Sequence, residues 1–328
     1  MKQIIVKNIN KSYKVHLKSE GVSGSIKSIL KRRFITTEAV KDISFEVNSS
    51  EVLGLIGLNG AGKTTIIKMI SGVIKPDNGY IEVLGSNPFL KSNNYRKSVA
   101  LVMGNKGQLD YDVSILDNVL LYASIYGISK KIALDRVNDM ANELELSNHD
   151  LKKQVRSLSL GQRMKGELIL SFLHLPKIIF LDEPTLGLDF ISQRKIRNYI
   201  KSYKEKHDAS IILTSHYIED IEDLCERILI INKGQELYYG SIEKLKEEMP
   251  NYKKLKFITT PEIVEILRKR FENVEFAYYN NNVEVRTEGK LIMQIIQLIT
   301  TLDDYRDITI EEDNLDIIIE QLYKERGM

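Results

Sequence analysis

The chain has 328 residues, of which 43% are hydrophobic and 28% charged, a composition typical of soluble globular proteins with about two domains. It contains no run of about 18 apolar residues and no apolar leader in MKQIIVKNINKSYK, so we expect neither a membrane-spanning helix nor a secretory signal. The net charge of +2 disfavours nucleic-acid binding as the main function, and the single cysteine, Cys225, fits a reducing cytoplasm.

Two strand patterns separated by a basic insert open the chain. Residues 3–13 (QIIVKNINKSY) predict an edge strand, and residues 38–47 (EAVKDISFEV) resume the pattern. The insert, at about 15–37, contains a glycine-rich turn and then KSILKRRF, whose apolar and basic residues have the spacing of a short amphipathic helix. Such a helix is suited to an anionic membrane surface, and a solvated loop helix is the alternative.

A phosphate-binding loop follows at residues 57–64. The segment GLNGAGKT fits G-x-x-x-x-G-K-[ST] and lies between a strand-like run, EVLGLIG, and a helical run, TTIIKMISG. Glycines allow successive backbone N–H groups to turn inward, and a helix N-terminus favours anions. We therefore expect the loop to bind a nucleoside triphosphate, with Lys63 at the β- and γ-phosphates and the Thr64 hydroxyl on Mg²⁺.

From residue 51 to about 240, strand-like and helical runs alternate, which indicates a parallel sheet covered by helices. In the run KIIFLDEP, Asp182 and Glu183 end a buried strand, where open α/β sheets place their ligands. We expect Asp182 to hold Mg²⁺ opposite Thr64 and Glu183 to polarise a water in line with the γ-phosphate. Without the phosphate loop, the same acidic pair would be interpreted as a helix cap.

The character of the sequence changes near residue 240. We predict a first domain at 1–240, a charged linker at 241–250 and an accessory α+β domain at 251–328. The last of these has the order strand, helix, strand, strand, helix, strand, with a final helix, which suggests a small ferredoxin-like module. It contains no nucleophile–base pair or metal-ligand cluster, so we expect a structural or dimer-stabilising role, with a regulatory ligand site as the second option.

Five segments in register resemble the nucleotide-binding subunit of ABC transporters: residues 57–65, LSLGQ (158–162), IIFLDEP (178–184), LGLD (186–189) and TSH (214–216). The resemblance covers about residues 1–240. It implies the P-loop NTPase fold of ABC ATPases, with an antiparallel β subdomain and a helical subdomain at about 90–170. It also implies that two cassettes pair head to tail, so that each ATP lies between the phosphate loop of one copy and the LSLGQ segment of the other.

The resemblance assigns individual residues to the site. It implies that Ser159 and Gly161 contact the γ-phosphate of the partner's ATP, although Leu160 stands where the family usually has glycine. In the family, a histidine at the position of His216 bridges the γ-phosphate and the catalytic glutamate. The loop after SVALVM usually carries a glutamine that senses Mg²⁺; here Asn105 is expected to contact the metal through water, or Gln108 to replace it.

The expected site therefore has three groups of residues. The catalytic group is Glu183, His216 and Lys63. The metal group is Thr64, Asp182 and Asn105. The ATP-binding group includes an adenine-stacking tyrosine, the residues of the phosphate loop, the LSLGQ segment with one residue beside the ribose, and an aspartate facing the opposite cassette: Tyr13, Gly57, Leu58, Asn59, Gly60, Ala61, Gly62, Lys63, Thr64, Thr65, Ser159, Gly161, Gln162 and Asp189.

The function implied is that of a separate cassette of a second-type ABC exporter. The interval from residue 65 to 156 lacks the sustained heptads of chromosome-organising relatives, and the chain has one phosphate loop where ribosome-associated relatives have two. The implied partners are a second copy or a paralogous cassette, integral membrane permease subunits and the inner leaflet, with the chain on the cytoplasmic face of the cell membrane. A soluble non-transport ABC ATPase, regulatory or associated with nucleic acid or ribosomes, is the alternative.

Overall fold

The computed structural model describes residues 2–16, 34–104, 107–249, 252–302 and 305–326. Its chain divides into two compact units, residues 1–240 and 241–328. The basic insert predicted at about 15–37 falls largely outside the described residues. None of the helices in the described ranges combines the length and the apolar character that a bilayer crossing requires.

The first unit contains a three-stranded antiparallel sheet in the order β2-β1-β4. Its strands are β1 (Lys2–His16), β2 (Phe34–Asn48) and β4 (Asn78–Val83). The prediction that the first strand lies at an edge was wrong, because Ile4 pairs with Val47 of β2 and with Val83 of β4. Alternation of apolar and polar residues shows which face of a strand is buried but not how many neighbours it has.

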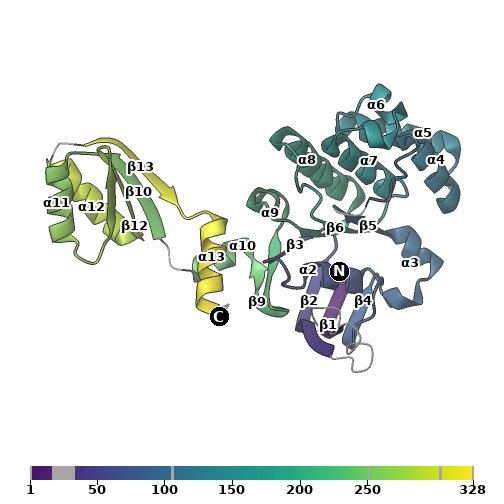
Figure 1. Ribbon diagram of the computed structural model, residues 1–328, viewed down its shortest axis with the longest axis horizontal. Helices are drawn as coiled ribbons and strands as arrows, with labels where there is room; N and C mark the ends of the chain where they lie inside the picture. The colour runs from purple at the N-terminus through teal and green to yellow at the C-terminus, as the bar shows by residue number, and fades with distance from the viewer. Residues whose placement is uncertain (1, 17–33, 105–106, 250–251, 303–304, 327–328) are drawn as a thin grey trace, which may run out of the picture. The chain divides into compact units, whose positions relative to one another are not determined.

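A six-stranded sheet in the order β5-β6-β7-β3-β8-β9 forms the centre of this unit, and β5 to β8 in that order run parallel. Its strands are β3 (Val52–Gly57), β5 (Val99–Met103), β6 (Ile178–Asp182), β7 (Ser210–Thr214), β8 (Arg227–Asn232) and β9 (Gln235–Ser241). Figure 1 shows α2 (Lys63–Ile70) on one face and α8 (Phe190–His207) and α9 (Ile218–Leu224) on the other. The central strands β6 and β7 are buried along their whole length because helices cover both faces of the sheet, which confirms the predicted sheet.

The helix α2 joins the two sheets into one hydrophobic core. Ile66 and Ile67 of α2 pack in the same cluster as Ile4 of β1, Phe45 of β2 and Leu53 of β3. Two short elements, η1 (Pro88–Leu90) and α3 (Asn93–Ser98), lead from β4 to β5. The start of α2, where the phosphate loop ends, is therefore held from two sides.

A group of helices follows β5: α4 (Ile115–Tyr126), α5 (Lys130–Glu143), α6 (Asn148–Lys152), η2 (Val155–Ser157) and α7 (Leu160–Phe172). Each of the four α-helices begins after a serine whose hydroxyl accepts the backbone N–H three residues on: Ser114, Ser129, Ser147 and Ser159. A serine at this position satisfies one of the unpaired N–H groups of the first turn. The sequence thus sets where each helix starts.

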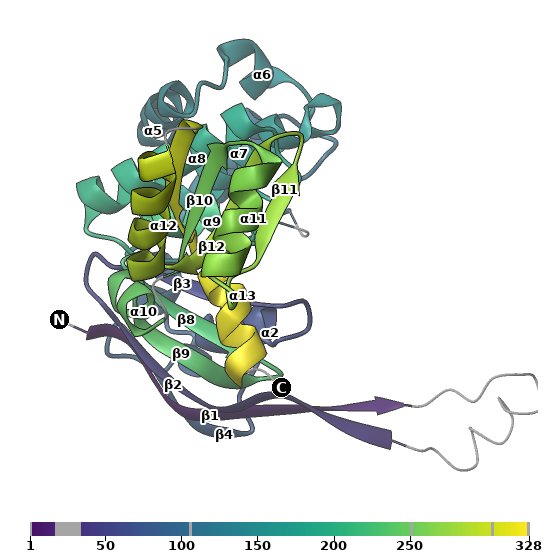
Figure 2. The ribbon, with the colours of Figure 1, turned by 90° about the vertical axis from the view of Figure 1, so that its left-hand side faces the viewer.

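The second unit begins with α10 (Ile242–Glu248) and continues through a four-stranded sheet in the order β11-β12-β10-β13. Its elements are β10 (Tyr252–Ile258), α11 (Pro261–Arg270), β11 (Phe276–Tyr279), β12 (Asn282–Glu288), α12 (Gly289–Leu302), β13 (Arg306–Glu312) and α13 (Leu315–Arg326). In Figure 2, α11 and α12 lie together on one face of the sheet, and their Leu267 and Ile295 share a core with Phe257 of β10. This is the strand and helix order of the ferredoxin-like module; the precise domain limits stay a prediction.

Candidate functional site

The phosphate loop runs from the end of β3 to the first residue of α2. Gly60 and Gly62 have positive φ angles of 81° and 112°, which glycine adopts without steric cost. At Gly62 a Cβ would lie 2.5 Å from the carbonyl oxygen of Ala39 on β2, and at Gly57 it would lie 2.9 Å from that of Ile231 on β8. The neighbouring strands therefore fix the curl of the loop and require glycine at both positions.

Lys63 is buried at the base of this loop. Its Nζ donates to the carbonyl oxygen of Gly57 at 2.6 Å, so the ammonium lies across the loop opening. Burial lowers the pKa of Lys63, and the carboxylates of Glu183 and Asp182 act in the opposite direction. A buried cation beside a ring of backbone N–H groups is a strong site for an anion such as a polyphosphate.

Asp182, Thr64 and Thr214 form a polar cluster beside the phosphate loop. Thr64 Oγ1 donates to Asp182 Oδ2 at 3.0 Å, and Thr214 Oγ1 donates to Asp182 Oδ1 at 2.8 Å. Mg²⁺ prefers hard oxygen ligands and is commonly held by one or two protein oxygens together with phosphates and waters. The hydroxyl of Thr64 and the carboxylate of Asp182 fit that donor set, with Thr214 orienting the carboxylate.

Glu183 directly follows Asp182 and turns toward His216. The ring nitrogen Nε2 of His216 lies 2.9 Å from Glu183 Oε1. The backbone of Glu183 is left-handed, with a φ of 59°, and its N–H donates to Thr214 O at 3.1 Å and to Thr214 Oγ1 at 3.0 Å. A non-glycine residue in this conformation stores strain of about 1–3 kcal/mol, which persists only where surrounding contacts enforce it. Here those contacts aim a carboxylate at the space above the phosphate loop.

A cavity of about 490 Å³ brings these groups together. Its lining comprises residues 58–65, which include the catalytic residue Lys63, the other two catalytic residues, Glu183 and His216, and two neighbours, Ala39 and Leu186. Most of the residues predicted for ATP and for catalysis therefore face one space. A polyphosphate there would meet backbone donors, a lysine, a hydroxyl and a carboxylate paired with histidine.

Ser159, Gly161 and Gln162 do not line this cavity. They form the start of α7, where Ser159 is exposed, Gln162 is half-buried and Gly161 is buried. Ser159 Oγ accepts the N–H of Gln162 at 3.2 Å, and Gln162 Oε1 accepts that of Ser159 at 3.0 Å. Asp189 lies nearby at the start of α8, its carboxylate accepting both the N–H and the hydroxyl of Ser192, and these bonds lower its pKa. A Cβ at Gly161 would lie 2.7 Å from Ser192 Oγ, so the two helix starts are in contact.

The remaining predicted residues lie apart. Tyr13 on β1 is 39% exposed, with Lys11 Nζ 5.9 Å from its ring centroid, and it does not line the cavity at the phosphate loop. Asn105, predicted to contact Mg²⁺ through water, lies outside the described residues. Gln108 is engaged elsewhere: its Nε2 donates to Leu101 O at 2.6 Å and to Ser171 Oγ at 3.2 Å.

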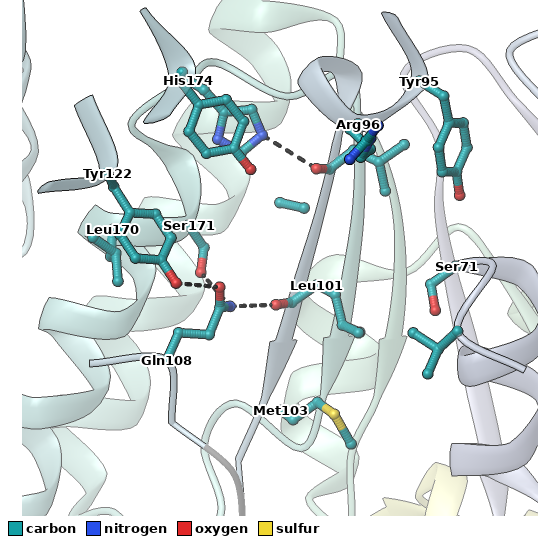
Figure 3. A pocket seen from close by; sticks show the side chains of 14 residues that line it. Ser71, Tyr95, Arg96, Leu101, Met103, Gln108, Tyr122, Leu170, Ser171 and His174 are labelled. Atoms are coloured by element: carbon teal, nitrogen blue, oxygen red, sulfur yellow. Dashed lines mark hydrogen bonds between the residues drawn. The ribbon is translucent and has the colours of Figure 1, made fainter. Parts of the chain in front are cut away.

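Gln108 belongs to a second cavity of about 340 Å³, formed by β5, α3, α4 and α7. Figure 3 shows its amide between Leu101 of β5 and Ser171 of α7, with Tyr122 of α4 on the other side. His174 closes the upper part of this cavity, where burial lowers its pKa and its ring stacks on Tyr126. We call this space the α4–β5 pocket.

Two buried groups of the site were missed by sequence reasoning. One is Asp220 of α9, fully buried, which accepts the hydroxyl of Ser215 at 2.6 Å and that of Thr185, and pairs with Arg197 at 2.9 Å. The other is Glu167 of α7, whose pKa is raised by burial. Both depend on contacts between elements distant in sequence, and only Thr185 and Ser215, flanking the motif residues, give a local signal.

Comparisons with known proteins agree with this geometry. A family model described as "ABC transporter" matches residues 40–186. An uncharacterized ABC transporter ATP-binding protein of Methanocaldococcus jannaschii is 34% identical over 254 residues, which span 75% of this chain and 90% of the relative. Nod factor export ATP-binding protein I of a Rhizobium species is 30% identical over 287 residues, spanning 84% of this chain and 93% of the relative. A solved structure titled "Structure of ATP binding subunit of ABC transporter" matches with a TM-score of 0.62 and 25% identity, over 75% of this chain and 92% of that one.

Proposed function

Because this chain belongs to the ABC transporter family as one of its ATP-binding subunits, we propose that it powers export through separate membrane subunits, binding Mg·ATP between two copies and hydrolysing it. The observation that carries the proposal is the division of the predicted site. Lys63, Glu183 and His216 line the cavity at the phosphate loop, whereas Ser159 and Gly161 lie outside it. Each copy thus supplies one half of two shared sites.

Exposed apolar side chains support a second copy as the partner. Leu58 in the phosphate loop, Leu160 in the LSLGQ segment and the pair Phe190 and Ile191 at the start of α8 are all exposed. Leu160, Phe190 and Ile191 lie at two helix starts that contact each other, and an exposed apolar patch marks a protein contact surface. Head-to-tail pairing of two copies would cover these side chains and bring Ser159 to the partner's γ-phosphate.

In this arrangement Thr64 and Asp182 would hold Mg²⁺, which would neutralise charge on the phosphates when bound. Lys63 and the loop N–H groups bind the phosphates, and Glu183 accepts a proton from the attacking water. His216 keeps the carboxylate of Glu183 oriented through their 2.9 Å contact. Closure of two copies on ATP, and reopening after hydrolysis, is the motion transmitted to the membrane subunits.

We predict that two inactive variants restore activity when mixed. Lys63→Ala removes the phosphate-binding cation and Ser159→Ala removes the hydroxyl supplied to the partner, so each variant alone should hydrolyse ATP slowly. A mixed dimer has one intact site, made of the phosphate loop from the Ser159→Ala copy and the LSLGQ segment from the other. With random pairing we expect about a quarter of the wild-type rate of phosphate release. If mixed dimers form with ATP but no activity returns, Ser159 does not serve the partner's ATP.

The α4–β5 pocket is our candidate for the contact with the membrane subunits. Tyr122 and Tyr126 of α4 line it, and the same helix exposes Leu121 and Ile125 beside them. A partly apolar groove next to exposed apolar side chains fits an amphipathic helix of a partner. The pocket also contains Gln108, from the loop that leads back to the nucleotide site, so occupancy there would act on that loop.

We predict that the tagged chain, purified from its native membranes in mild detergent, carries integral membrane proteins with it. The double variant Leu121→Ser, Ile125→Ser should lose them, because its substitutions are confined to exposed side chains of α4. Ile266→Ser, an exposed apolar position on α11, is the matched control and should retain them. Equal recovery of membrane proteins with the wild type, the double variant and Ile266→Ser would show that α4 is not the docking surface. Absence of membrane proteins from the wild-type preparation would contradict the transport role.

The relatives reported above give no support to a soluble non-transport function.

A further inference from the structure

Thr214 is the last residue of β7 and lies in the sheet between Asp182 of β6 and Leu55 of β3. Its side chain is fully buried. The three residues before it, IIL, are apolar, and a valine would have the same branched shape and suit a buried strand equally well. Burial of a hydroxyl costs free energy unless the group is hydrogen-bonded. The reason for a threonine here must therefore lie in the bonds of its hydroxyl.

The hydroxyl of Thr214 contacts both members of the acidic pair. Oγ1 donates to Asp182 Oδ1 at 2.8 Å and accepts the backbone N–H of Glu183 at 3.0 Å. A hydroxyl has one proton, so its donor capacity is used by the carboxylate while a lone pair serves the amide. One oxygen atom thus touches the residue expected to hold Mg²⁺ and the residue expected to accept a proton from water.

The bond to Asp182 fixes the orientation of its carboxylate from outside the nucleotide site. The other carboxylate oxygen, Oδ2, accepts the hydroxyl of Thr64 at 3.0 Å, but Thr64 is itself an expected ligand of the cation. Thr214 does not line the cavity at the phosphate loop, whereas Thr64 does. Removal of a group that holds a metal-binding carboxylate in this way costs about 10- to 100-fold in metal affinity or activity.

The bond to Glu183 acts on its backbone. The N–H of Glu183 is shared between Thr214 O at 3.1 Å and Thr214 Oγ1 at 3.0 Å. The first acceptor is present with any residue at position 214, and the second requires a hydroxyl. Because the left-handed conformation of Glu183, with a φ of 59°, is strained, it depends on such contacts. The same backbone carries the carboxylate that meets His216 at 2.9 Å.

We propose that Thr214 is a positioning residue for ATP hydrolysis, whose hydroxyl holds the carboxylate of Asp182 and the backbone of Glu183 in one fixed arrangement. The inference rests on the function proposed above. Within the described residues, no side-chain hydrogen bond joins Thr214 to the phosphate loop, where Lys63 Nζ bonds to Gly57 O. Loss of the hydroxyl should therefore impair turnover and its dependence on Mg²⁺, and leave the binding of metal-free ATP intact.

The kinetic test compares Thr214→Val, which keeps the branched shape without the hydroxyl, with Thr214→Ser, which keeps the hydroxyl. In Thr214→Val we expect kcat for ATP hydrolysis to fall about tenfold and the Mg²⁺ concentration for half-maximal activity to rise about tenfold. KM for ATP at saturating Mg²⁺ should stay within about twofold of the wild type, because the phosphate loop is untouched. Thr214→Ser should restore kcat to within about threefold.

Two further measurements do not depend on hydrolysis. Equilibrium dialysis with ATP in EDTA should give the wild-type dissociation constant, within about twofold, for both variants. Amide hydrogen exchange at Glu183 should be faster in Thr214→Val than in the wild type, because its N–H has lost one of two acceptors. Thr214→Ser should exchange at the wild-type rate.

Ser210→Ala is the matched control. Ser210 begins β7, is fully buried, donates to Asn48 O at 2.8 Å and accepts the N–H of Ser50 at 3.1 Å. It is thus a buried hydroxyl with one bond given and one accepted, at the opposite end of the same strand. Its loss should lower the urea midpoint about as much as Thr214→Val does, with kcat and the Mg²⁺ dependence as in the wild type.

Three kinetic results would overturn the inference: wild-type kcat and Mg²⁺ dependence in Thr214→Val, equal kinetic losses in Thr214→Val and Ser210→Ala, or no recovery in Thr214→Ser. If Thr214→Val does not fold, Thr214→Ala takes its place in the same comparison. Failure of both to fold would also count against the inference, since the hydroxyl would then be a requirement of the fold. A wild-type chain without ATPase activity would instead contradict the proposed function, which keeps the two failures distinct.

Discussion

Glu183→Gln is expected to bind ATP and to lose about 10²- to 10⁴-fold in the rate of hydrolysis, the range contributed by a general base. The amide has nearly the same shape as the carboxylate but cannot accept a proton from water. It can still meet His216 Nε2, which lies 2.9 Å from Glu183 Oε1 in the wild type. The left-handed backbone at this residue is held by Thr214 through bonds that the substitution does not touch.

Phosphate release and size-exclusion chromatography with Mg·ATP are the measurements for this variant. Because closure on ATP precedes hydrolysis in the proposed cycle, Glu183→Gln should accumulate as a dimer while the wild type returns to the monomer. The control is Glu205→Gln, an exposed position on α8, which should behave as the wild type. Hydrolysis by Glu183→Gln at the wild-type rate would show that another group is the base.

Asp220→Ala is expected to lower the free energy of unfolding of the first unit by about 1–3 kcal/mol, because it removes a buried acceptor of Arg197, which then keeps, among the described residues, only its ion pair with Asp223 at 2.8 Å. Arg197 is only 5% exposed, so its guanidinium cannot turn to water. The hydroxyls of Thr185 and Ser215 would also lose their acceptor. Both lie next to motif residues, Thr185 two positions after Glu183 and Ser215 directly before His216.

Urea denaturation followed by circular dichroism measures this change. Glu219→Ala is the matched control, since Glu219 is exposed, adjacent in sequence and in the first turn of the same helix. Its removal should cost at most about 1 kcal/mol, the contribution of a carboxylate near a helix N-terminus. Equal stability of the two variants would mean that the Asp220 cluster is not a stabilising element.

Local motifs made most of the nucleotide site predictable. The phosphate loop needs a strand, glycines, a lysine and a helix in sequence, and all of them lie within residues 52–70. Asp182 and Glu183 were predictable because the end of a buried parallel strand is where such sheets bind ligands. The meeting of His216 with Glu183 followed only from the resemblance to a family, since 33 residues and one helix separate them.

The parts that could not be predicted depend on contacts with no sequence signature. In the sequence Glu167 looks like any other polar residue of a helix. Its carboxylate nevertheless accepts hydrogen bonds from backbone N–H groups 58 and 59 residues away. Asp220 reads as an ordinary acidic residue of the first turn, yet α8 supplies its cation. The position of β1 in its sheet was mispredicted for the same reason. The alternation of apolar and polar residues is a local pattern, whereas the neighbours of a strand come from distant parts of the chain.

The hydrogen bonds at the start of α7 lower the entropic cost of closing the dimer on ATP. Ser159 caps the helix by using its oxygen as an acceptor, and Gln162 returns the bond to the backbone of Ser159. A hydroxyl has one proton and two lone pairs, so capping leaves the proton available for an anion. The side chain is thus locked in one rotamer before any ATP arrives. The entropy of ordering it has been lost during folding, and we expect the approaching phosphate to meet a donor that needs no rearrangement.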